Sequence, residues 1–173
     1  MQSSSYWKAV LLDRDNFLDR ILNFLKSSGV RFCVIGGTGV NAYADPVVTE
    51  DLDIVVAAEE IEALETALAR DFKVRRFPHS INVSAPPAKL QLQIQTDPRY
   101  FDYVERAETR NVMDFLLPVA RIDDLLQGKV WAAMDPERRR SKRQKDLADI
   151  ARILEGFPNL RDGLPAALLD KLL

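Results

Sequence analysis

The chain has 173 residues, of which 47% are hydrophobic and 29% are charged, and its formal net charge is −2. This composition is ordinary for a globular protein with one sizeable core, and it excludes a strongly basic nucleic-acid-binding protein. The single cysteine, Cys33, and the single histidine, His79, exclude an internal disulfide and a multi-histidine metal site. We find no signal-peptide-like apolar run and no stretch that fits a membrane span, so we expect a cytoplasmic protein without a membrane partner.

Hydrophobic periodicity predicts helices and strands in a mixed order. The predicted helices cover residues 7–26, 59–70, 121–134, 141–155 and a short last segment from Pro165. Residues 37–44 are expected to form a short helix or a turn, and residues 100–106 a short helix or an irregular segment. The predicted strands cover residues 30–35, 51–57, 72–77, 89–96 and 111–119. This order favours an α+β fold with a mixed sheet flanked by helices over a regular βαβ array. We expect residues 1–120 to form the core with an N-terminal helix, and residues 121–173 to form a helical cap packed on it within one compact domain.

The most informative stretch is residues 34–56, where a glycine pair ends one predicted strand and two aspartates begin the next. Gly36 and Gly37 supply backbone that a phosphate can approach closely at the start of a helix. Asp51 and Asp53 are separated by Leu52, so in a strand both carboxylates project from one face. Two like charges this close repel each other unless a cation lies between them, and Mg²⁺ suits such oxygen ligands. The stretch therefore predicts a site for a divalent metal and a phosphate.

Two other interpretations of this stretch are open from the residues alone. Residues 37–42 match the G-x-G-x-x-A fingerprint of dinucleotide-binding folds. That fold needs a longer helix than Pro46 allows, and its acidic residue comes at the far end of the second strand. Alternatively, the two aspartates are solvated residues of an edge strand. Their position beside a strand-ending glycine pair favours the metal-site interpretation.

The same residues resemble a known family. Gly36-Gly37, followed by Thr49-x-Asp51-Leu-Asp53, is similar to the signature of the nucleotidyltransferase superfamily that includes DNA polymerase beta. More narrowly, the chain resembles the small bacterial nucleotidyltransferases of the AbiEii toxin type. Residues 118–133, with Lys129, and the segment from Arg138 through Lys145-Asp146 to Asp149 resemble the helices that close the nucleotide cleft in that group. The resemblance covers residues 30–155.

The resemblance implies roles for individual residues. It implies that the paired aspartates bind Mg²⁺ or Mn²⁺, that the glycine turn holds the phosphates of an NTP, and that later lysines reach the triphosphate. Carried over, the catalytic and metal-binding residues are Asp51 and Asp53, and the nucleotide-binding residues are Gly36, Gly37, Thr38, Lys129 and Lys145. Thr38 stands where the family often has serine.

One strand departs from the family pattern. The family's third carboxylate lies on a neighbouring strand, which here is the predicted strand 89–96. Its outward face carries Gln91, Gln93 and Gln95, and Gln93 in the middle is our choice for the catalytic position. A glutamine carbonyl accepts hydrogen bonds but cannot take a proton from an attacking hydroxyl. Asp97, Glu105 or a water molecule are the alternatives for that task.

The expected function is Mg²⁺-dependent transfer of a nucleoside monophosphate from an NTP to a hydroxyl acceptor. The acceptors that we consider are RNA such as tRNA, a protein or a small molecule. The further partners that we consider are an antitoxin and a second copy of the chain. Six positive charges in residues 138–145 suit a triphosphate or an RNA end. The alternative function, motivated by the glutamines, is a noncatalytic module that binds nucleotide or protein and lacks the third carboxylate.

Overall fold

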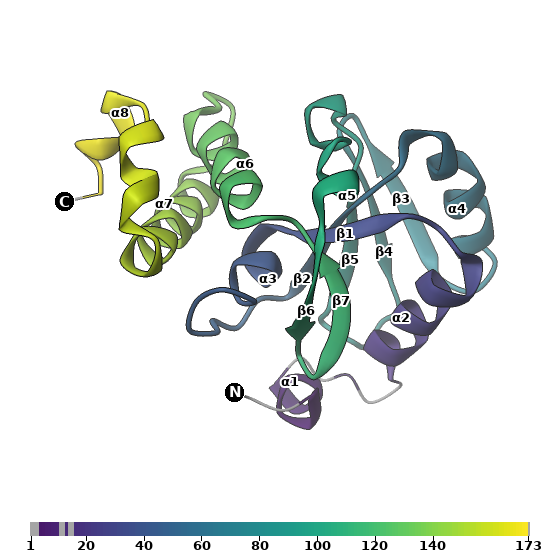
Figure 1. Ribbon diagram of the computed structural model, residues 1–173. Helices are drawn as coiled ribbons and strands as arrows, with labels where there is room; N and C mark the ends of the chain where they lie inside the picture. Colours follow the sequence, from purple (N-terminus) through teal and green to yellow (C-terminus); the bar gives the residue numbers. More distant parts are fainter. Residues whose placement is uncertain (1–3, 11–12, 14–15, 173) are drawn as a thin grey trace.

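The computed structural model describes residues 4–10, 13 and 16–172 and shows a mixed sheet with helices around it (Figure 1). The helices are α1 Ser4–Val10, α2 Phe17–Ser28, α3 Gly36–Val40, α4 Ile61–Leu68, α5 Tyr103–Arg106, α6 Ile122–Met134, α7 Arg140–Gly156 and α8 Ala166–Leu169. The strands are β1 Phe32–Ile35, β2 Asp51–Val56, β3 Lys73–Phe77, β4 Ser80–Ser84, β5 Gln91–Gln95, β6 Glu108–Val112 and β7 Phe115–Val119. Short 3₁₀ turns cover Ala58–Glu60, Pro98–Tyr100 and Pro158–Gly163.

The sheet has seven strands in the order β3-β4-β5-β2-β1-β7-β6. β2 is antiparallel to β1 and parallel to β5, and β1 is parallel to β7. This mixture of parallel and antiparallel pairs confirms the predicted α+β class. β1 and β2 lie in the middle of the sheet, which explains why all four residues of β1 are buried.

Two hydrophobic clusters stabilise the molecule. The larger cluster joins apolar side chains of α2 and α4 to those of the sheet, and it includes Phe17 and Leu22 of α2 and Leu52 and Leu92 of the strands. The smaller cluster joins α6, α7 and α8 to the end of α3. These three helices lie together at one end of the molecule, separated from the far part of the sheet by α3 and β1 (Figure 1). No described helix has both the length and the apolar content that crossing a bilayer would require.

The predicted helix 7–26 is wrong as a single element. α1 ends at Val10 and α2 begins at Phe17, while residues 11–12 and 14–15 of the prediction lie outside the described residues. The buried Asp13 carboxylate accepts hydrogen bonds from the backbone N–H groups of Phe17 and Leu18. Asn16 has a left-handed backbone with a φ of 54°. A side-chain cap at this position begins a new helix, because it satisfies the free N–H groups of the first turn.

Two strands differ from the sequence prediction. β4 was not predicted, because Ile81 and Val83 are its only buried residues and two apolar positions give little periodicity. The predicted strand 111–119 is a hairpin of β6 and β7 instead. Its turn residues, Met113 and Asp114, have φ values of 52° and 68°. Positive φ at both central positions is the geometry of the tight turns that join twisted antiparallel strands.

Candidate active site

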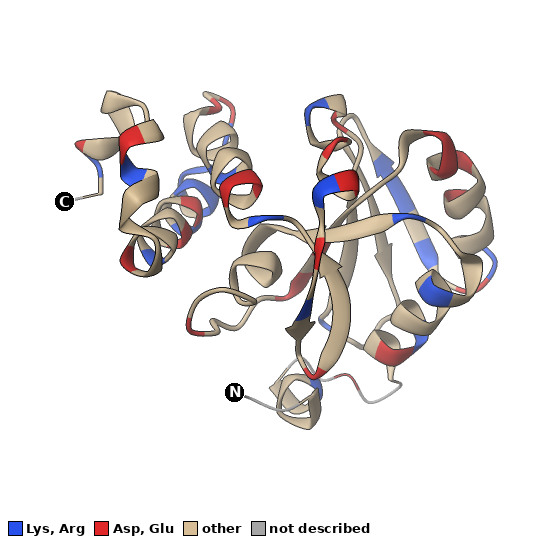
Figure 2. Ribbon diagram, viewed as in Figure 1, with Lys and Arg blue, Asp and Glu red and all other residues tan. Residues whose placement is uncertain are grey.

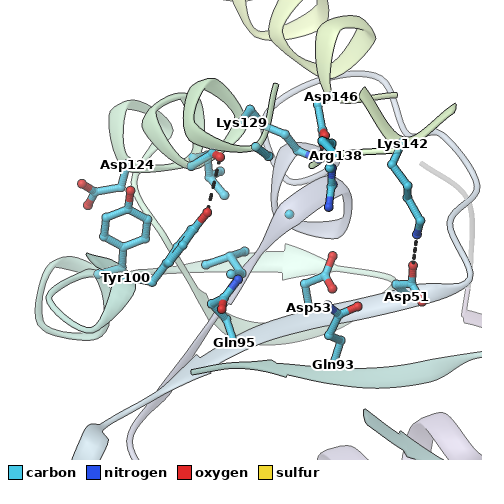
Figure 3. A pocket seen from close by; sticks show the side chains of 16 residues that line it. Asp51, Asp53, Gln93, Gln95, Tyr100, Asp124, Lys129, Arg138, Lys142 and Asp146 are labelled. Atoms are coloured by element: carbon cyan, nitrogen blue, oxygen red, sulfur yellow. Dashed lines mark hydrogen bonds and ion pairs between the residues drawn. The ribbon is translucent and has the colours of Figure 1, made fainter. Parts of the chain in front are cut away.

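The two aspartates lie side by side at the start of β2. Asp51 and Asp53 are half-buried and share one face, while Leu52 between them is fully buried on the other. β5 runs parallel to this strand, with Gln93 paired with Asp53 and Gln91 paired with Asp51. The glutamine strand is therefore the direct neighbour of β2, and Gln93 is in register with Asp53. Figure 3 shows the carboxylate of Asp53 beside the amide of Gln93.

Two adjoining cavities form a cleft above these residues. The first has a volume of about 270 Å³ and extends over Gln93 and Gln95 to Tyr100, Tyr103 and Asp124. The second has a volume of about 480 Å³ and extends over Gly37 and Thr49 to Lys145 and Arg152. The residues that line both cavities are Asp51, Asp53, Lys129, Arg138, Lys142 and Asp146. The cleft thus has carboxylates from β2 on one side and cations from α6, α7 and the segment between them on the other (Figure 3).

The glycine turn touches the aspartates. Gly36 has a φ of +64°, and a Cβ atom on it would lie 2.3 Å from the Oδ2 atom of Asp53. Gly37 has ordinary backbone angles, and its Cβ would lie 3.6 Å from Asp149. Gly36 is therefore the residue that lets β1 turn against Asp53, since any side chain there would displace the carboxylate. Gly37 lines the second cavity with its backbone.

Thr38 lies behind the aspartates. It is 2% exposed, and its hydroxyl donates a 2.9 Å hydrogen bond to the backbone oxygen of Asp51. It lines a third cavity, bounded by Trp7, Asn41 and Tyr43, and does not line the cleft. The structure thus gives Thr38 a contact that fixes the start of β2, and does not place it with the other predicted nucleotide-binding residues.

Lys129 belongs to a buried ion network. Its ammonium lies 3.0 Å from Asp146 and 2.8 Å from Asp149, and its side chain is 12% exposed. Arg138 lies 2.9 Å from the second oxygen of Asp146. Burial alone would lower the pKa of Lys129, but Asp149 and Asp146 outweigh it and raise that pKa, so the ammonium stays charged. The partners of Asp146 thus come from α6 and from the residues before α7, whereas Asp149 also pairs along α7, with Arg152 at 2.8 Å.

α7 places two further lysines in the cleft. Lys142 lies 3.3 Å from the Oδ2 atom of Asp51, and the predicted residue Lys145 lines the second cavity. We did not single out Lys142 within the basic run. Lys142 and Lys145 are three residues apart and Lys142 is four residues from Asp146, so all three lie on one side of a helix. That spacing is the signal that could have identified Lys142.

The environment of Asp53 shifts its acidity strongly. Burial, and then the charge of Asp51, raise the pKa of Asp53 to about 7, against the opposing influence of Lys129, Lys142 and Arg138. The cations therefore do not balance the cost of bringing these two carboxylates together. Such a pair is a fitting site for a divalent cation, because a metal ion would satisfy both oxygens at once.

Among the residues that the structure describes, no third carboxylate joins Asp51 and Asp53 in a metal-binding group. Asp97 caps the turn after β5 and pairs with Arg99 at 2.8 Å, and Glu105 is exposed on α5. Asp124 lines the far end of the first cavity but pairs with Arg106 at 2.8 Å. Within residues 4–10, 13 and 16–172 no group of three or more histidine, cysteine or acidic side chains could hold a metal ion. The donor set at β2 is thus two carboxylates beside the Gln93 amide, which suits a metal that keeps positions open for substrate.

The glycine geometry generates a first prediction. Gly36→Ala should lower the free energy of unfolding by at least about 2 kcal/mol, because the residue combines a positive φ with an overlap onto Asp53. Gly37→Ala is the matched control and should leave stability unchanged or raise it by up to about 1 kcal/mol. Urea unfolding of both variants checks this. Equal destabilisation by the two substitutions would contradict the conclusion that Gly36 alone makes room for the carboxylate of Asp53.

The acidity of Asp53 generates a second prediction, for the protein in the presence of a metal chelator. The pKa of Asp53 is about 7 in the folded protein, whereas an unfolded aspartate titrates near 3.9. The folded state therefore binds the extra proton between these values, and the wild type loses stability as the pH rises through them. Asp53→Asn removes the ionisation, so its stability advantage should grow from pH 4 to pH 7 and then level off, at no more than about 4 kcal/mol.

Thermal unfolding across that pH range measures this difference. Asp162→Asn supplies the control for the loss of one carboxylate, because Asp162 is exposed on the turn before α8. A Tm difference between Asp53→Asn and the wild type that does not change with pH would contradict the assignment of Asp51 and Asp53 as a desolvated pair of carboxylates.

Comparison with known proteins agrees with this geometry. The fold is similar to that of the antibiotic-resistance factor ANT(2'')-Ia, with a TM-score of 0.65 and 12% sequence identity over 93% of this chain and 94% of that chain. It is also similar to the lincosamide antibiotic adenylyltransferase LnuA, with a TM-score of 0.56 and 15% identity over 79% and 95% of the two chains. A nucleotidyltransferase-like protein from Paracoccidioides brasiliensis gives a TM-score of 0.54 and 19% identity over 89% and 78%. At these identities the likeness establishes the fold.

A comparison with curated protein sequences found no match. A family model does match the sequence. It describes the nucleotidyl transferase AbiEii toxin of type IV toxin–antitoxin systems, and it matches residues 17–173, which include both aspartates, the glycine pair and the cationic helices. The chain therefore belongs to the AbiEii nucleotidyltransferase family.

Proposed function

We propose that this chain is a Mg²⁺-dependent nucleotidyltransferase, which moves a nucleoside monophosphate from an NTP to a hydroxyl acceptor and releases pyrophosphate. One observation carries the proposal. Asp51 and Asp53 face a cleft whose opposite wall carries several cations, and the repulsion between the two carboxylates is not relieved by the protein itself. A bound metal ion would compensate the charge of the two carboxylates, and a polyanionic substrate would compensate the charge of the cations on the opposite wall.

Asp51 and Asp53 are the residues that would hold Mg²⁺ or Mn²⁺. When bound there, the ion would supply charge neutralisation on the phosphates of the NTP. Lys142 of α7 pairs with Asp51 at 3.3 Å, so a positive charge already lies beside that carboxylate. Gly36 holds the turn against Asp53 and thereby fixes the position of the second ligand.

The second cavity fits the triphosphate. Lys142, Lys145 and Arg152 project into it from α7, and the backbone of Gly37 lines its opposite side. Lys129 is fixed by Asp146 and Asp149 and stays charged, so it presents a positive charge without needing to reorganise. These cations would offset the charge that develops on the leaving pyrophosphate.

Gln93 limits what the protein can do for the acceptor. Its carbonyl beside Asp53 could accept a hydrogen bond from the acceptor hydroxyl and orient it. The amide cannot take the proton, so in this proposal the proton passes to water. The rate should then depend more on positioning than on general base catalysis.

The same residue favours a second candidate function. A chain that has Gln93 in the register position beside Asp53 could be a noncatalytic module, which binds an NTP or a protein without transferring a nucleotide. We also propose, from the description of the family as a toxin, that an antitoxin protein is a partner of this chain and that both act in the cytoplasm.

The proposal predicts that NTP binding depends on the metal and on the lysines of α7. Mg²⁺ and an NTP together should raise the Tm of the wild type, and Lys145→Ala should reduce that shift and weaken binding about tenfold or more. Arg140→Ala is the matched control, because Arg140 is an exposed cation of the same helix that lines neither cavity.

A second experiment tests transfer. Each labelled NTP is incubated with the protein and cell lysate, and the RNA, protein and small-molecule fractions are separated. Binding without label in any fraction would favour a noncatalytic module that binds nucleotide, and an absence of NTP binding would contradict the transferase.

Replacement of Gln93 distinguishes the two candidates further. Gln93→Asp would add a third anion on the strand next to Asp53, within about 5 Å. Without metal the variant should unfold at a lower temperature than the wild type, and Mn²⁺ should reverse that loss. If the site is a weakened transferase, nucleotide transfer should also rise. Gln91→Asp, beside Asp51, is the register control. A Gln93→Asp variant whose Tm does not respond to metal would show that this position does not face the metal site.

A further inference from the structure

The loop between α3 and β2, residues 41–50, connects the glycine turn to the aspartates. It begins directly after the helix that carries Gly36 and Gly37, and it ends at Asp51. Its residues 47–50 line the second cavity together with the lysines of α7. The later part of the loop forms no helix or strand, so contacts from other parts of the chain must fix this wall of the cavity.

Arg152 of α7 supplies such contacts. Its Nη2 atom donates hydrogen bonds to the side-chain oxygen of Asn41 at 2.7 Å and to the backbone oxygen of Asp45 at 2.5 Å. Its Nη1 atom donates to Asp149 at 2.8 Å, so the guanidinium joins its own helix to the loop. Three acceptors divided between two nitrogen atoms match the fixed fork of a guanidinium, which the single ammonium of a lysine cannot reproduce.

Asn41 extends this contact to the wall of the second cavity. Its amide nitrogen donates to the backbone oxygen of Val47 at 2.8 Å, and its Oδ1 atom accepts from the backbone N–H of Val47 at 3.0 Å. These two bonds fix the backbone of Val47, although its side chain is 52% exposed. Asn41 lines the third cavity and neither of the two that form the cleft. Its amide is therefore placed to hold the loop and not to touch a nucleotide.

The same arginine is continuous with the buried ion network of the cleft. Asp149 accepts from Arg152 with its Oδ1 atom and pairs with Lys129 through its Oδ2 atom at 2.8 Å. Lys129 and Arg138 in turn share Asp146. Figure 2 shows the basic and acidic residues interspersed along α7. A connected series of ion pairs thus runs from the loop to the cations that face the aspartates.

These contacts distinguish Arg152 from the other cations of the second cavity. Lys142 reaches Asp51 with a side chain that is 43% exposed, whereas the side chain of Arg152 is 17% exposed and its guanidinium is engaged by three acceptors of the protein. An arginine held in this way acts mainly through position. It orders the loop before a ligand arrives, so the ligand does not bear the entropic cost of ordering it.

We propose that Arg152 is a positioning residue, which together with Asn41 holds residues 41–50 in the shape that receives the triphosphate. This inference rests on the proposed transferase function and assigns a role within its nucleotide site. The fork of the Arg152 side chain, and not only its charge, then determines the affinity of the cleft for an NTP.

The test measures the Kd of each NTP in the presence of Mg²⁺ by calorimetry. Arg152→Lys keeps the charge and loses the fork, whereas Asn41→Ala keeps every charge of the cleft and breaks the contact with Val47. Each substitution should raise Kd about tenfold or more. The double variant should show an effect smaller than the product of the two, because both remove one shared contact. Asn159→Ala, on the exposed turn after α7, is the control and should leave Kd unchanged.

Mg²⁺ alone is titrated into the same variants to separate positioning of the loop from a general loss of structure. Its Kd should stay the same, because Thr38 and Gly36 hold the start of β2 and the carboxylate of Asp53 without the loop. In transfer assays the variants should raise KM for the NTP more than they lower kcat. Metal and nucleotide binding that weaken together would overturn the proposal.

Hydrogen exchange of the backbone N–H groups of residues 45–50 tests the contact without any ligand. Exchange should be faster in Arg152→Lys and in Asn41→Ala than in the wild type. Unchanged exchange in both variants would overturn the proposal, and so would an Arg152→Lys variant that binds NTP as tightly as the wild type, because charge alone would then suffice. A wild type that binds no NTP would instead contradict the proposed transferase function, and this inference with it.

Discussion

The repulsion between Asp51 and Asp53 is the constraint on which the rest of the site depends. Burial of Asp53, and then the charge of Asp51 on the same strand face, raise the pKa of Asp53 to about 7, which expresses the cost of holding both carboxylates there. The fold holds them there from several sides. The buried Leu52 fixes the strand to the core, Thr38 holds the backbone of Asp51, and the absence of a side chain at Gly36 leaves room for Asp53. Strain of this kind is retained where a ligand relieves it.

The cations of α6, α7 and the segment between them compensate the negative charge of Asp51 and Asp53 in two different ways. Lys129 and Arg138 are fixed by Asp146, so their positions are set by buried ion pairs between α6, α7 and the segment that joins them. Lys142 is 43% exposed and reaches Asp51 from α7, so its side chain is free to exchange the carboxylate for a phosphate. Two fixed cations, Lys129 and Arg138, and one mobile cation, Lys142, thus face the same cleft. In the proposed function, the fixed cations would position a triphosphate and Lys142 would follow its charge.

The sequence predicted the centre of this architecture well and its periphery less well. Asp51-Leu-Asp53 and the alternation of residues 89–96 predicted which side chains share a face, because a one-residue slip would bury the polar side of the strand. The pairing of Gln93 with Asp53 comes from the structure, since a shift by two residues would keep the same face outward. The cap at Asp13 and the strand β4 were missed, since each rests on few residues and on contacts distant in sequence. The ion network could not be predicted, because Asp146 meets Lys129 from another helix and a charge pattern along one helix cannot show that.

The measurement that tests the central claim most directly is proton release on metal binding. Mg²⁺ or Mn²⁺ is titrated into the wild-type protein by calorimetry at pH 7 and pH 9, in buffers of different ionisation enthalpy. If the metal binds to Asp51 and Asp53, it must displace the proton from Asp53, because metal ligands are deprotonated. The pKa of about 7 then predicts release of about half a proton per ion at pH 7 and almost none at pH 9. Two results would contradict the claim that Asp51 and Asp53 form a cation site whose negative charge the protein alone leaves uncompensated. They are metal binding with no proton release at pH 7, and no metal binding at either pH.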